Sequence, residues 1–455
     1  MARPLGTLAA FSAVLLLAAL VGPAQAQPAG LRQIDRIVVI FLENRSFDNL
    51  FGLFPGANGI AEARPERTIQ VDRDGRPYTV LPPVMDTHAK PPAPDPRFPP
   101  NLPNRPFLID GYVPLQGKDP DLVHRWYQQQ AQINGGRMDK FAAYSDAGGL
   151  VMGYHDGSKT RLWEWARQYT LADNFFHAAF GSSFLNHFWL VCACTPRFPN
   201  APAAMVAQLG PTGEIIKDGA VTPDGYAVNT SFSVYQPHPP NTPPAQLVPP
   251  QTAPTIGDRL NDKGVSWVWY SGGWNAALAG DYGRAFQFHH QPFVYFRNYG
   301  DGTEAKRLHL KDETDLYAAI ESGTLPAVSF YKPVGEDNEH PGYASIATGD
   351  ARVGDLLNRL ATSPMFRSMA IIVTYDENGG FWDHVPPPRI DRWGPGARVP
   401  AIVISPFAKR GFVDHTLYDT TSIMRLIETR YGLAPVAERD AAANDLTNAF
   451  VFSRP

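Results

Sequence analysis

Short apolar runs alternate along this chain with amphipathic stretches of helical period. The first run, residues 37–42, is rich in β-branched side chains, which is typical of a strand buried on both faces of a parallel sheet. Comparable runs predict further strands at residues 265–270, 325–331, 370–375 and 401–404. Helical periodicity predicts helices at residues 255–261, 350–360 and 421–431. This alternation predicts an α/β fold with a central, mostly parallel sheet and helices on both faces.

Two proline-rich stretches interrupt the alternation. Residues 82–106 and 236–254 are crowded with proline and have little apolar periodicity, so both are predicted to be long surface loops. We therefore expect residues 27–455 to form a single domain with loop insertions near 82–120 and 200–254. The sequence has no repeats of solenoid length, no glycine-rich nucleotide fingerprint, no Walker loop and no CxxC metal pair.

The N-terminus has the pattern of a targeting segment. A basic residue precedes an apolar run, and the small-x-small site Ala24-Gln25-Ala26 follows that run. The pattern predicts a signal peptide over residues 1–26. No later stretch is long and apolar enough to span a bilayer. We therefore expect an exported protein, periplasmic or secreted.

The chain contains two cysteines, Cys192 and Cys194. Export permits disulfide bonds. A pair only two residues apart makes a strained bridge at best, so the sequence favours two buried thiols over a disulfide.

Charge excludes some partners. The 455 residues include 40 Lys and Arg against 44 Asp and Glu, for a net charge of −4. Nothing in this near balance indicates nucleic acid binding or electrostatic docking on an anionic membrane. The oligomeric state is left open.

Two of the predicted strands stop on oxygen-bearing side chains. Glu43 and Asn44 follow the first strand directly, and Asp376 and Glu377 follow the strand at 370–375. Ligands of open α/β sheets gather outside the carboxyl ends of the strands. Carboxylate and amide oxygens suit a hard divalent cation. The pattern predicts a metal site there; the alternative is a polar loop with a helix N-cap at Asn44.

A predicted helix begins at two serines. After Ser182 and Ser183, apolar residues recur at three- and four-residue spacing as far as Cys192, which predicts a helix with a buried face. Helix starts attract phosphate through free N–H groups and the helix dipole. Local sequence favours a serine that only caps the helix. The functional interpretation is that one serine caps while the other is a nucleophile activated by a nearby metal.

Several histidines lie near polar or aromatic residues, although each alone is typical of a structural histidine. His124 falls in a helical stretch predicted to run from Asp121 to about Asn134. His289 and His290 lie among aromatic residues, and a polar loop contains His340.

Four motifs in this order make the chain resemble one family. The motifs are Glu43-Asn44-Arg45-Ser46-Phe47-Asp48-Asn49-Leu50-Phe51-Gly52, Gly181-Ser182-Ser183-Phe184-Leu185-Asn186-His187, Asp376-Glu377-Asn378-Gly379-Gly380-Phe381-Trp382-Asp383-His384 and Val399-Pro400-Ala401-Ile402-Val403-Ile404-Ser405-Pro406-Phe407. They resemble the bacterial phosphoesterase family of non-haemolytic-type phospholipases C and periplasmic acid phosphatases, within the alkaline phosphatase superfamily. The resemblance runs from about residue 33 to 432. It implies an α/β sandwich that hydrolyses phosphoesters through a phosphorylated hydroxyl residue.

The resemblance also implies roles for individual residues. Ser183 matches the nucleophile. The implied ligands of one divalent metal ion (Ca²⁺, Mg²⁺, Mn²⁺ or Zn²⁺) are Glu43, Asn44, Asp376 and Glu377, with Ser183 completing the set. The histidines expected to surround the phosphate are His124, His289, His290 and His340. Cationic histidines would give an activity optimum below neutral pH, because the unperturbed pKa of histidine is about 6.5.

Details of the motifs favour the acid phosphatase branch. The phospholipases usually have Thr after Gly-Pro in the nucleophile turn, where this chain has Gly181-Ser182-Ser183. They commonly have Glu-His after the aspartate of the second metal motif, where this chain has Glu377-Asn378. We therefore expect an exported, broad-specificity acid phosphatase. The alternatives are a phospholipase C that cleaves phosphatidylcholine-type lipids and, outside enzymes, an exported metal-binding or adhesion module.

Overall fold

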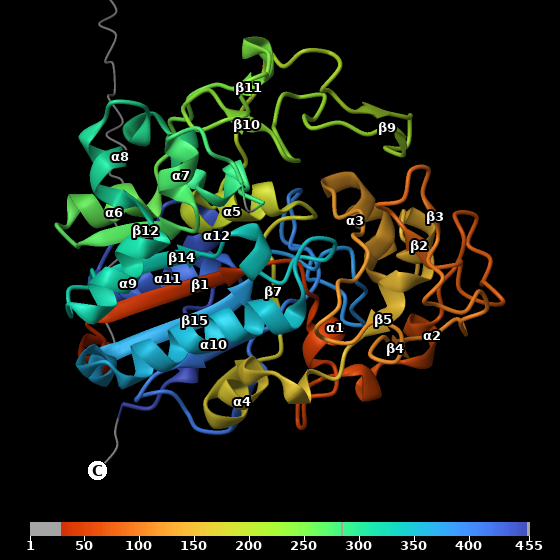
Figure 1. Ribbon diagram of the computed structural model, residues 1–455, viewed down its shortest axis with the longest axis horizontal. Coiled ribbons are helices and arrows are strands. Elements are labelled where there is room, and N and C mark those ends of the chain that lie inside the picture. The colour runs from red at the N-terminus through yellow and green to blue at the C-terminus, as the bar shows by residue number, and fades with distance from the viewer. Residues whose placement is uncertain (1–28, 284, 453–455) are drawn as a thin grey trace, which may run out of the picture.

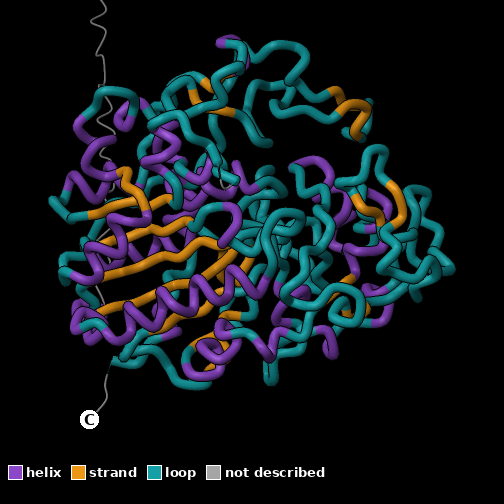
Figure 2. Tube along the Cα trace, in the orientation of Figure 1, coloured by secondary structure: helices purple, strands orange, loops and turns teal. Residues whose placement is uncertain are grey.

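An eight-stranded sheet forms the centre of the protein (Figures 1 and 2). The computed structural model describes residues 29–283 and 285–452, so the predicted signal peptide lies outside the described residues. In spatial order, the strands are β13 (Leu310–Asp312), β12 (Trp267–Ser271), β14 (Val328–Lys332), β1 (Arg36–Leu42), β15 (Met369–Tyr375), β16 (Ala401–Ile404), β6 (Thr170–Ala172) and β17 (Phe412–Asp414).

The sheet is mostly parallel, as predicted. β1 pairs in parallel with β14 on one side and with β15 on the other, whereas β16 runs antiparallel to both of its neighbours. All seven residues of β15 are buried, and so are all residues of β1 except Arg36. Strands covered on both faces have no polar face to alternate with, which explains their continuous apolar runs.

Helices cover both faces of the sheet; in Figure 1, α10 crosses the near face and α11 lies behind. The α-helices are α1 (Phe47–Phe51), α2 (Pro65–Thr68), α3 (Trp126–Ile133), α4 (Arg161–Gln168), α5 (Ser183–Cys192), α6 (Ile256–Asp262), α7 (Trp274–Leu278), α8 (Glu304–His309), α9 (Glu313–Glu321), α10 (Ile346–Thr362), α11 (Thr421–Tyr431) and α12 (Glu438–Ala442). Among the described residues, no helix combines the length and the hydropathy of a membrane span.

Loop-rich segments extend from the end of the sheet where β1 and β15 stop, and Figure 1 shows the earlier of them in orange and yellow. A second, smaller core combines residues between Leu81 and Met152, such as Phe141, with Phe381 and Trp382 from the segment after β15. Besides the main sheet and the α-helices, the described residues form 3-10 turns and short strands, namely β2 (Met85–Asp86), β3 (Ala93–Pro94), β4 (Phe107–Leu108), β5 (Gly153–Tyr154), β7 (Phe175–Phe176), β8 (Gln208–Leu209), β9 (Ile215–Lys217), β10 (Phe232–Ser233), β11 (Leu247–Val248) and β18 (Tyr418–Asp419).

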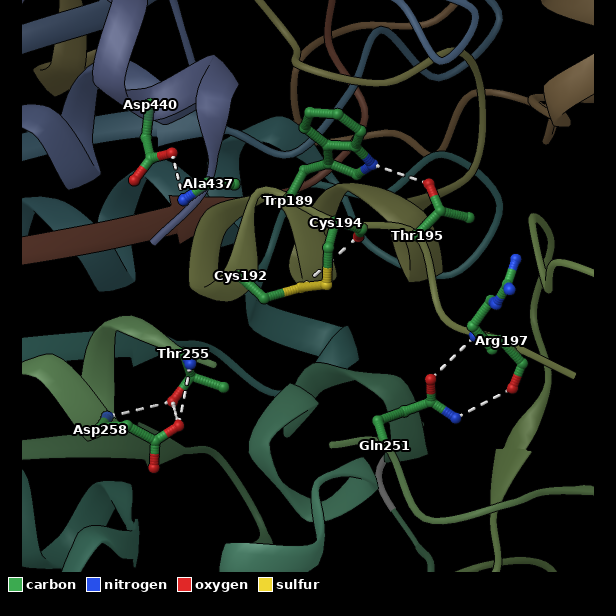
Figure 3. The surroundings of a disulfide bond; sticks show 10 residues. All are labelled: Trp189, Cys192, Cys194, Thr195, Arg197, Gln251, Thr255, Asp258, Ala437 and Asp440. Carbon is green, nitrogen blue, oxygen red and sulfur yellow. Dashed lines mark hydrogen bonds between the residues drawn. A yellow bond between two sulfur atoms is a disulfide. The ribbon is translucent and has the colours of Figure 1, made fainter. Parts of the chain in front are cut away.

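Two local predictions are wrong. Helix α3 begins at Trp126, with Arg125 extended before it, so His124 precedes the helix instead of lying on it. Cys192 and Cys194 form a disulfide instead of remaining thiols (Figure 3). Ala193 between them adopts a left-handed conformation at the end of α5. This turn brings the two Cα atoms to 5.1 Å, within the usual range for a bridge.

Candidate active site

The two polar strand ends meet at one edge of the sheet. Leu42 of β1 is paired with Tyr375 of β15, so the residues that follow them start side by side. The backbone N–H of Asn44 donates to Asp376 Oδ1 at 3.3 Å. Gly379 has a φ of +61°, and a Cβ at this position would lie 2.3 Å from the carbonyl oxygen of Asn44. Glycine is therefore required where the second segment turns past the first.

The turn before α5 is fixed by its own side chains and by α3. Asn186 accepts from Ala179 N at 3.0 Å and donates to the carbonyl oxygen of Gly181 at 2.7 Å. Gly181 packs so tightly that a Cβ would lie 2.3 Å from the carbonyl carbon of Arg125. The hydroxyl of Ser182, the N-cap residue, makes no capping hydrogen bond, so the prediction that a serine side chain caps this helix is wrong. The side chain of Asn186, instead of a serine hydroxyl, makes the hydrogen bonds that hold this turn.

This turn places Ser183 against the two strand ends. Its hydroxyl oxygen lies 3.3 Å from Asn44 Oδ1 and 3.4 Å from Glu377 Oε1, and its one proton can be donated to either. Hydrogen bonding to this hydroxyl also favours the ionised form of Asp376. The structure thus brings together Ser183, Asn44, Asp376 and Glu377 from three distant parts of the chain.

Glu43 joins the group through contacts with histidine and lysine nitrogen atoms. Its Oε1 atom lies 2.5 Å from His290 Nε2 and 2.7 Å from Lys332 Nζ. The contact with Lys332 is a close ion pair, although Glu43 Oε1 has no hydrogen bond of normal geometry. His340 Nε2 lies 3.8 Å from Glu43 Oε2. Glu43 is therefore surrounded by positively charged or polar nitrogen atoms.

A cavity of about 400 Å³ lies over Ser183. Three of the four histidines singled out from the sequence line it, namely His124, His289 and His340. His290 is directed at Glu43 and is absent from the lining. His289 Nδ1 is buried without a hydrogen-bond partner. His289 can therefore offer a ring nitrogen to a ligand in the cavity.

The histidines differ in charge because their neighbours differ. Burial favours neutral His124, but the carboxylates of Glu377 and Asp121 outweigh burial and raise its pKa to about 9. Burial lowers the pKa of His290 to about 4 and that of His289 well below its ordinary value. Burial also lowers the pKa of His340. The expectation of several cationic histidines therefore holds for His124 alone, and the argument for an acidic optimum loses its basis.

Two residues of the site were missed by the sequence analysis. His187 lies one helical turn after Ser183, and its Nδ1 is 2.7 Å from the carbonyl oxygen of Ser183 and 3.9 Å from Asp376 Oδ2. Its i+4 spacing from Ser183 is a signal that could have found it. Lys332 is the last residue of β14, and a lysine after an apolar run carries no comparable signal.

The donor set fits a divalent cation. Three carboxylates, those of Glu43, Asp376 and Glu377, are buried together. Asp376 Oδ2 has no hydrogen-bond partner. Burial and the neighbouring carboxylate of Glu43 raise the pKa of Asp376 well above its ordinary value, and burial raises the pKa of Glu377 to about 7. A divalent cation would supply the missing positive charge and the missing partner.

Comparison with known proteins identifies the family of the chain. The pattern of the Phosphoesterase family matches residues 34–434. Non-hemolytic phospholipase C of Pseudomonas aeruginosa is 26% identical over 96% of this chain and 60% of its own length, so the chain spans about three fifths of that relative. Phospholipase C B of Mycobacterium tuberculosis (strain ATCC 25618 / H37Rv) is 27% identical over 94% of this chain and 80% of its own length.

Among solved structures, a protein in the alkaline phosphatase superfamily from Vibrio parahaemolyticus is 11% identical. The match covers 72% of this chain and 73% of that chain, with a TM-score of 0.33. Because the family pattern covers most of the sequence, the chain belongs to the Phosphoesterase family.

Proposed function

We propose that this protein is a metal-dependent phosphoric ester hydrolase that acts through a phosphoserine at Ser183. The observation that carries the proposal is the position of the Ser183 hydroxyl. It lies within 3.4 Å of both Asn44 Oδ1 and Glu377 Oε1, at a cavity lined by three histidines. A hydroxyl that only caps a helix needs none of these neighbours.

The residues that would hold the cation are Glu43, Asn44, Ser183, Asp376 and Glu377. When bound, a divalent cation makes an oxygen nucleophile available near neutral pH and neutralises charge on the phosphoryl group. The chain itself orients the hydroxyl: Asn186 fixes the turn, and either Asn44 or Glu377 accepts from Ser183.

The first half of the reaction forms the phosphoserine. Ser183 releases its hydroxyl proton to solvent as Oγ attacks phosphorus, a new O–P bond forms, and the bond between phosphorus and the ester oxygen breaks. The leaving oxygen needs a proton. His124 lines the cavity and, with a pKa of about 9, is protonated at neutral pH, so we assign it as the general acid.

The second half releases phosphate. Water attacks the phosphoserine, the bond between phosphorus and Ser183 Oγ breaks, Oγ regains a proton from solvent, and inorganic phosphate leaves. His124, now neutral, takes a proton from the water and returns to its starting form. His289 and His340 line the cavity as neutral donors toward the phosphoryl oxygens. His290 acts on the phosphate only indirectly, through Glu43.

A small phosphomonoester is the substrate class that the cavity supports best. A volume of about 400 Å³ and a lining rich in histidine, serine and acidic side chains suit a compact polar phosphate ester. We therefore propose a broad-specificity phosphatase of the class that the motifs resemble, exported as the N-terminal pattern predicts. An exported binding or adhesion module would not require a nucleophile beside the acidic cluster.

A phospholipase C activity is the second candidate, because the relatives carry that name. A separate cavity of about 640 Å³ is lined by Trp126, Ile133, Phe180 and prolines 386–388. Trp126 directly follows Arg125 and Phe180 lies two residues before Ser182, and both Arg125 and Ser182 line the cavity over Ser183. Apolar surface this close to the site would suit the apolar part of a phospholipid.

One assay separates the candidates. The full chain is given a small aryl phosphate in one series and phosphatidylcholine vesicles in another, each with and without a chelator. The proposal predicts chelator-sensitive release of phosphate from the aryl ester and little cleavage of the lipid. Release of phosphocholine at a higher rate would select phospholipase C. Activity on neither substrate would favour the binding module. Activity that a chelator leaves unchanged would contradict the proposed dependence on a metal ion.

A further inference from the structure

Lys332 is a fully buried lysine that faces the acidic centre. It ends β14, beside β1, and its side chain has no exposed surface. Its Nζ atom lies 2.7 Å from Glu43 Oε1, 3.2 Å from the carbonyl oxygen of Leu42 and 3.7 Å from Asp376 Oδ2. The ring of Phe41 packs against the ammonium group, 5.2 Å from Nζ to the ring centre. Lys332 therefore touches both segments that carry the oxygen donors.

Burial of an ammonium group is unfavourable unless carboxylates or other acceptors compensate for lost water. Lys332 meets that condition through atoms of the site itself. Glu43 and Asp376 repel each other electrostatically, because both are buried carboxylates. A positive charge between them offsets this repulsion and holds their side chains in place.

The charges of the site then balance with one ion. Glu43, Asp376 and Glu377 carry three negative charges when ionised, and Lys332 carries one positive charge. One divalent cation together with Lys332 neutralises the three carboxylates. A second cation would need oxygen ligands, and the Glu43, Asp376 and Leu42 oxygen atoms beside Lys332 Nζ are already occupied by its ammonium group.

We infer that Lys332 is a positioning residue that ties Glu43 to Asp376 and takes the place of a second cation, so that the centre accepts one divalent ion. The inference rests on the proposed metal site, but the tie between the two carboxylates is a property of the chain alone. Lys332 needs no contact with substrate in this role.

The test compares Lys332→Met and Lys332→Arg with wild type, using Mn²⁺ alone as the probe. Equilibrium dialysis counts bound Mn²⁺, and thermal denaturation gives Tm before and after Mn²⁺ is added to chelator-treated protein. Lys306→Met is the control, because Lys306 pairs with Asp301 on another part of the chain. We expect one Mn²⁺ per wild-type chain. The Met variant should have a lower metal-free Tm, and Mn²⁺ should raise its Tm by roughly twice the wild-type shift or more, because the cation replaces the lost charge.

The Arg variant keeps the positive charge, so its metal-free Tm and its response to Mn²⁺ should stay closer to those of wild type. The Lys306→Met control should match wild type in both. Two tightly bound ions in wild type would overturn the inference. So would an unchanged metal-free Tm in the Met variant together with a wild-type response to Mn²⁺. If the Met variant does not fold, the inference is tested by the other two proteins: it requires one Mn²⁺ per wild-type chain and an Arg variant whose Tm and response to Mn²⁺ stay close to wild type. Absence of Mn²⁺ binding by wild type would instead count against the proposed metal site.

Discussion

Two buried acidic clusters form from the same two segments of the chain, yet only one has the character of an active site. The first contains Glu43, Asp376 and Glu377. The second contains Asp48 and Asp383, which lie a few residues after the ends of β1 and β15. Arg398 donates to Asp383 Oδ1 at 2.9 Å and to Asp48 Oδ1 at 3.2 Å.

The clusters differ in how their oxygen atoms are satisfied. In the second, His384 Nδ1 lies 2.7 Å from Asp48 Oδ2, and all four carboxylate oxygens have hydrogen-bond partners from the protein. In the first, Asp376 Oδ2 has none. Buried carboxylates with a histidine are therefore no sign of a metal site by themselves. An unsatisfied carboxylate beside a nucleophile is a stronger sign.

Loss of the nucleophile should have the largest effect. Ser183→Ala removes the atom that attacks phosphorus, so kcat should fall by a factor on the order of 10⁴ or more. Steady-state kinetics with an aryl phosphate measures the loss, and circular dichroism checks the fold. The matched control is Ser182→Ala, whose hydroxyl has no hydrogen-bond partner. A kcat for Ser183→Ala within about tenfold of wild type would assign the nucleophile elsewhere.

The second cluster should affect stability instead of chemistry. Arg398→Met leaves Asp48 and Asp383 buried without their cation, and breaking such a pair costs about 3–5 kcal/mol. Urea denaturation measures the free energy of unfolding. The exposed Arg392, which pairs with Asp224, supplies the control Arg392→Met, expected to cost less than about 1 kcal/mol. An Arg398 variant as stable as wild type would remove the distinction between the clusters.

A histidine in the cavity should matter less than the nucleophile. His289 lines the cavity and has an unpartnered ring nitrogen, so His289→Ala should lower kcat by about 10²–10³ through lost stabilisation of phosphoryl charge. His415→Ala, outside the cavity and largely exposed, is the control. Equal kcat values for the two variants would exclude His289 from the chemistry.

A buried carboxylate outside both clusters, that of Glu428, sharpens the comparison further. Burial, with Asp440 beside it, raises the pKa of Glu428 to about 9, whereas an unfolded glutamate titrates near 4.3. Between these pKa values the folded chain holds one more proton than the unfolded chain, so stability should fall as pH rises from 5 to 9. Glu428→Gln should remove this contribution, so the variant should lose less stability than wild type as pH rises from 5 to 9. Urea denaturation from pH 5 to 9 tests it; parallel curves for wild type and variant would contradict it.

Much of the fold followed from local pattern. The strands at β1 and β15 were predictable because burial on both faces demands continuous apolar runs, and the polar residues at their ends marked the site. Lys332 was not predictable, since only the pairing of β14 with β1 places its ammonium group at Glu43. The disulfide depends on the left-handed turn at Ala193, which an ordinary alanine does not signal. Arg398 binds both Asp48 and Asp383, which lie 335 positions apart in the chain, and only tertiary packing brings these residues together.

Phosphopeptide mapping after acid quench tests the central claim most directly. The full chain reacts briefly with an aryl phosphate, is denatured in acid and digested, and the phosphorylated residue is located by mass spectrometry. The account predicts phosphate on Ser183, and much less of it when a chelator is present. Phosphate on Ser182 or on another residue, or phosphate on Ser183 that chelation leaves unchanged, would contradict it.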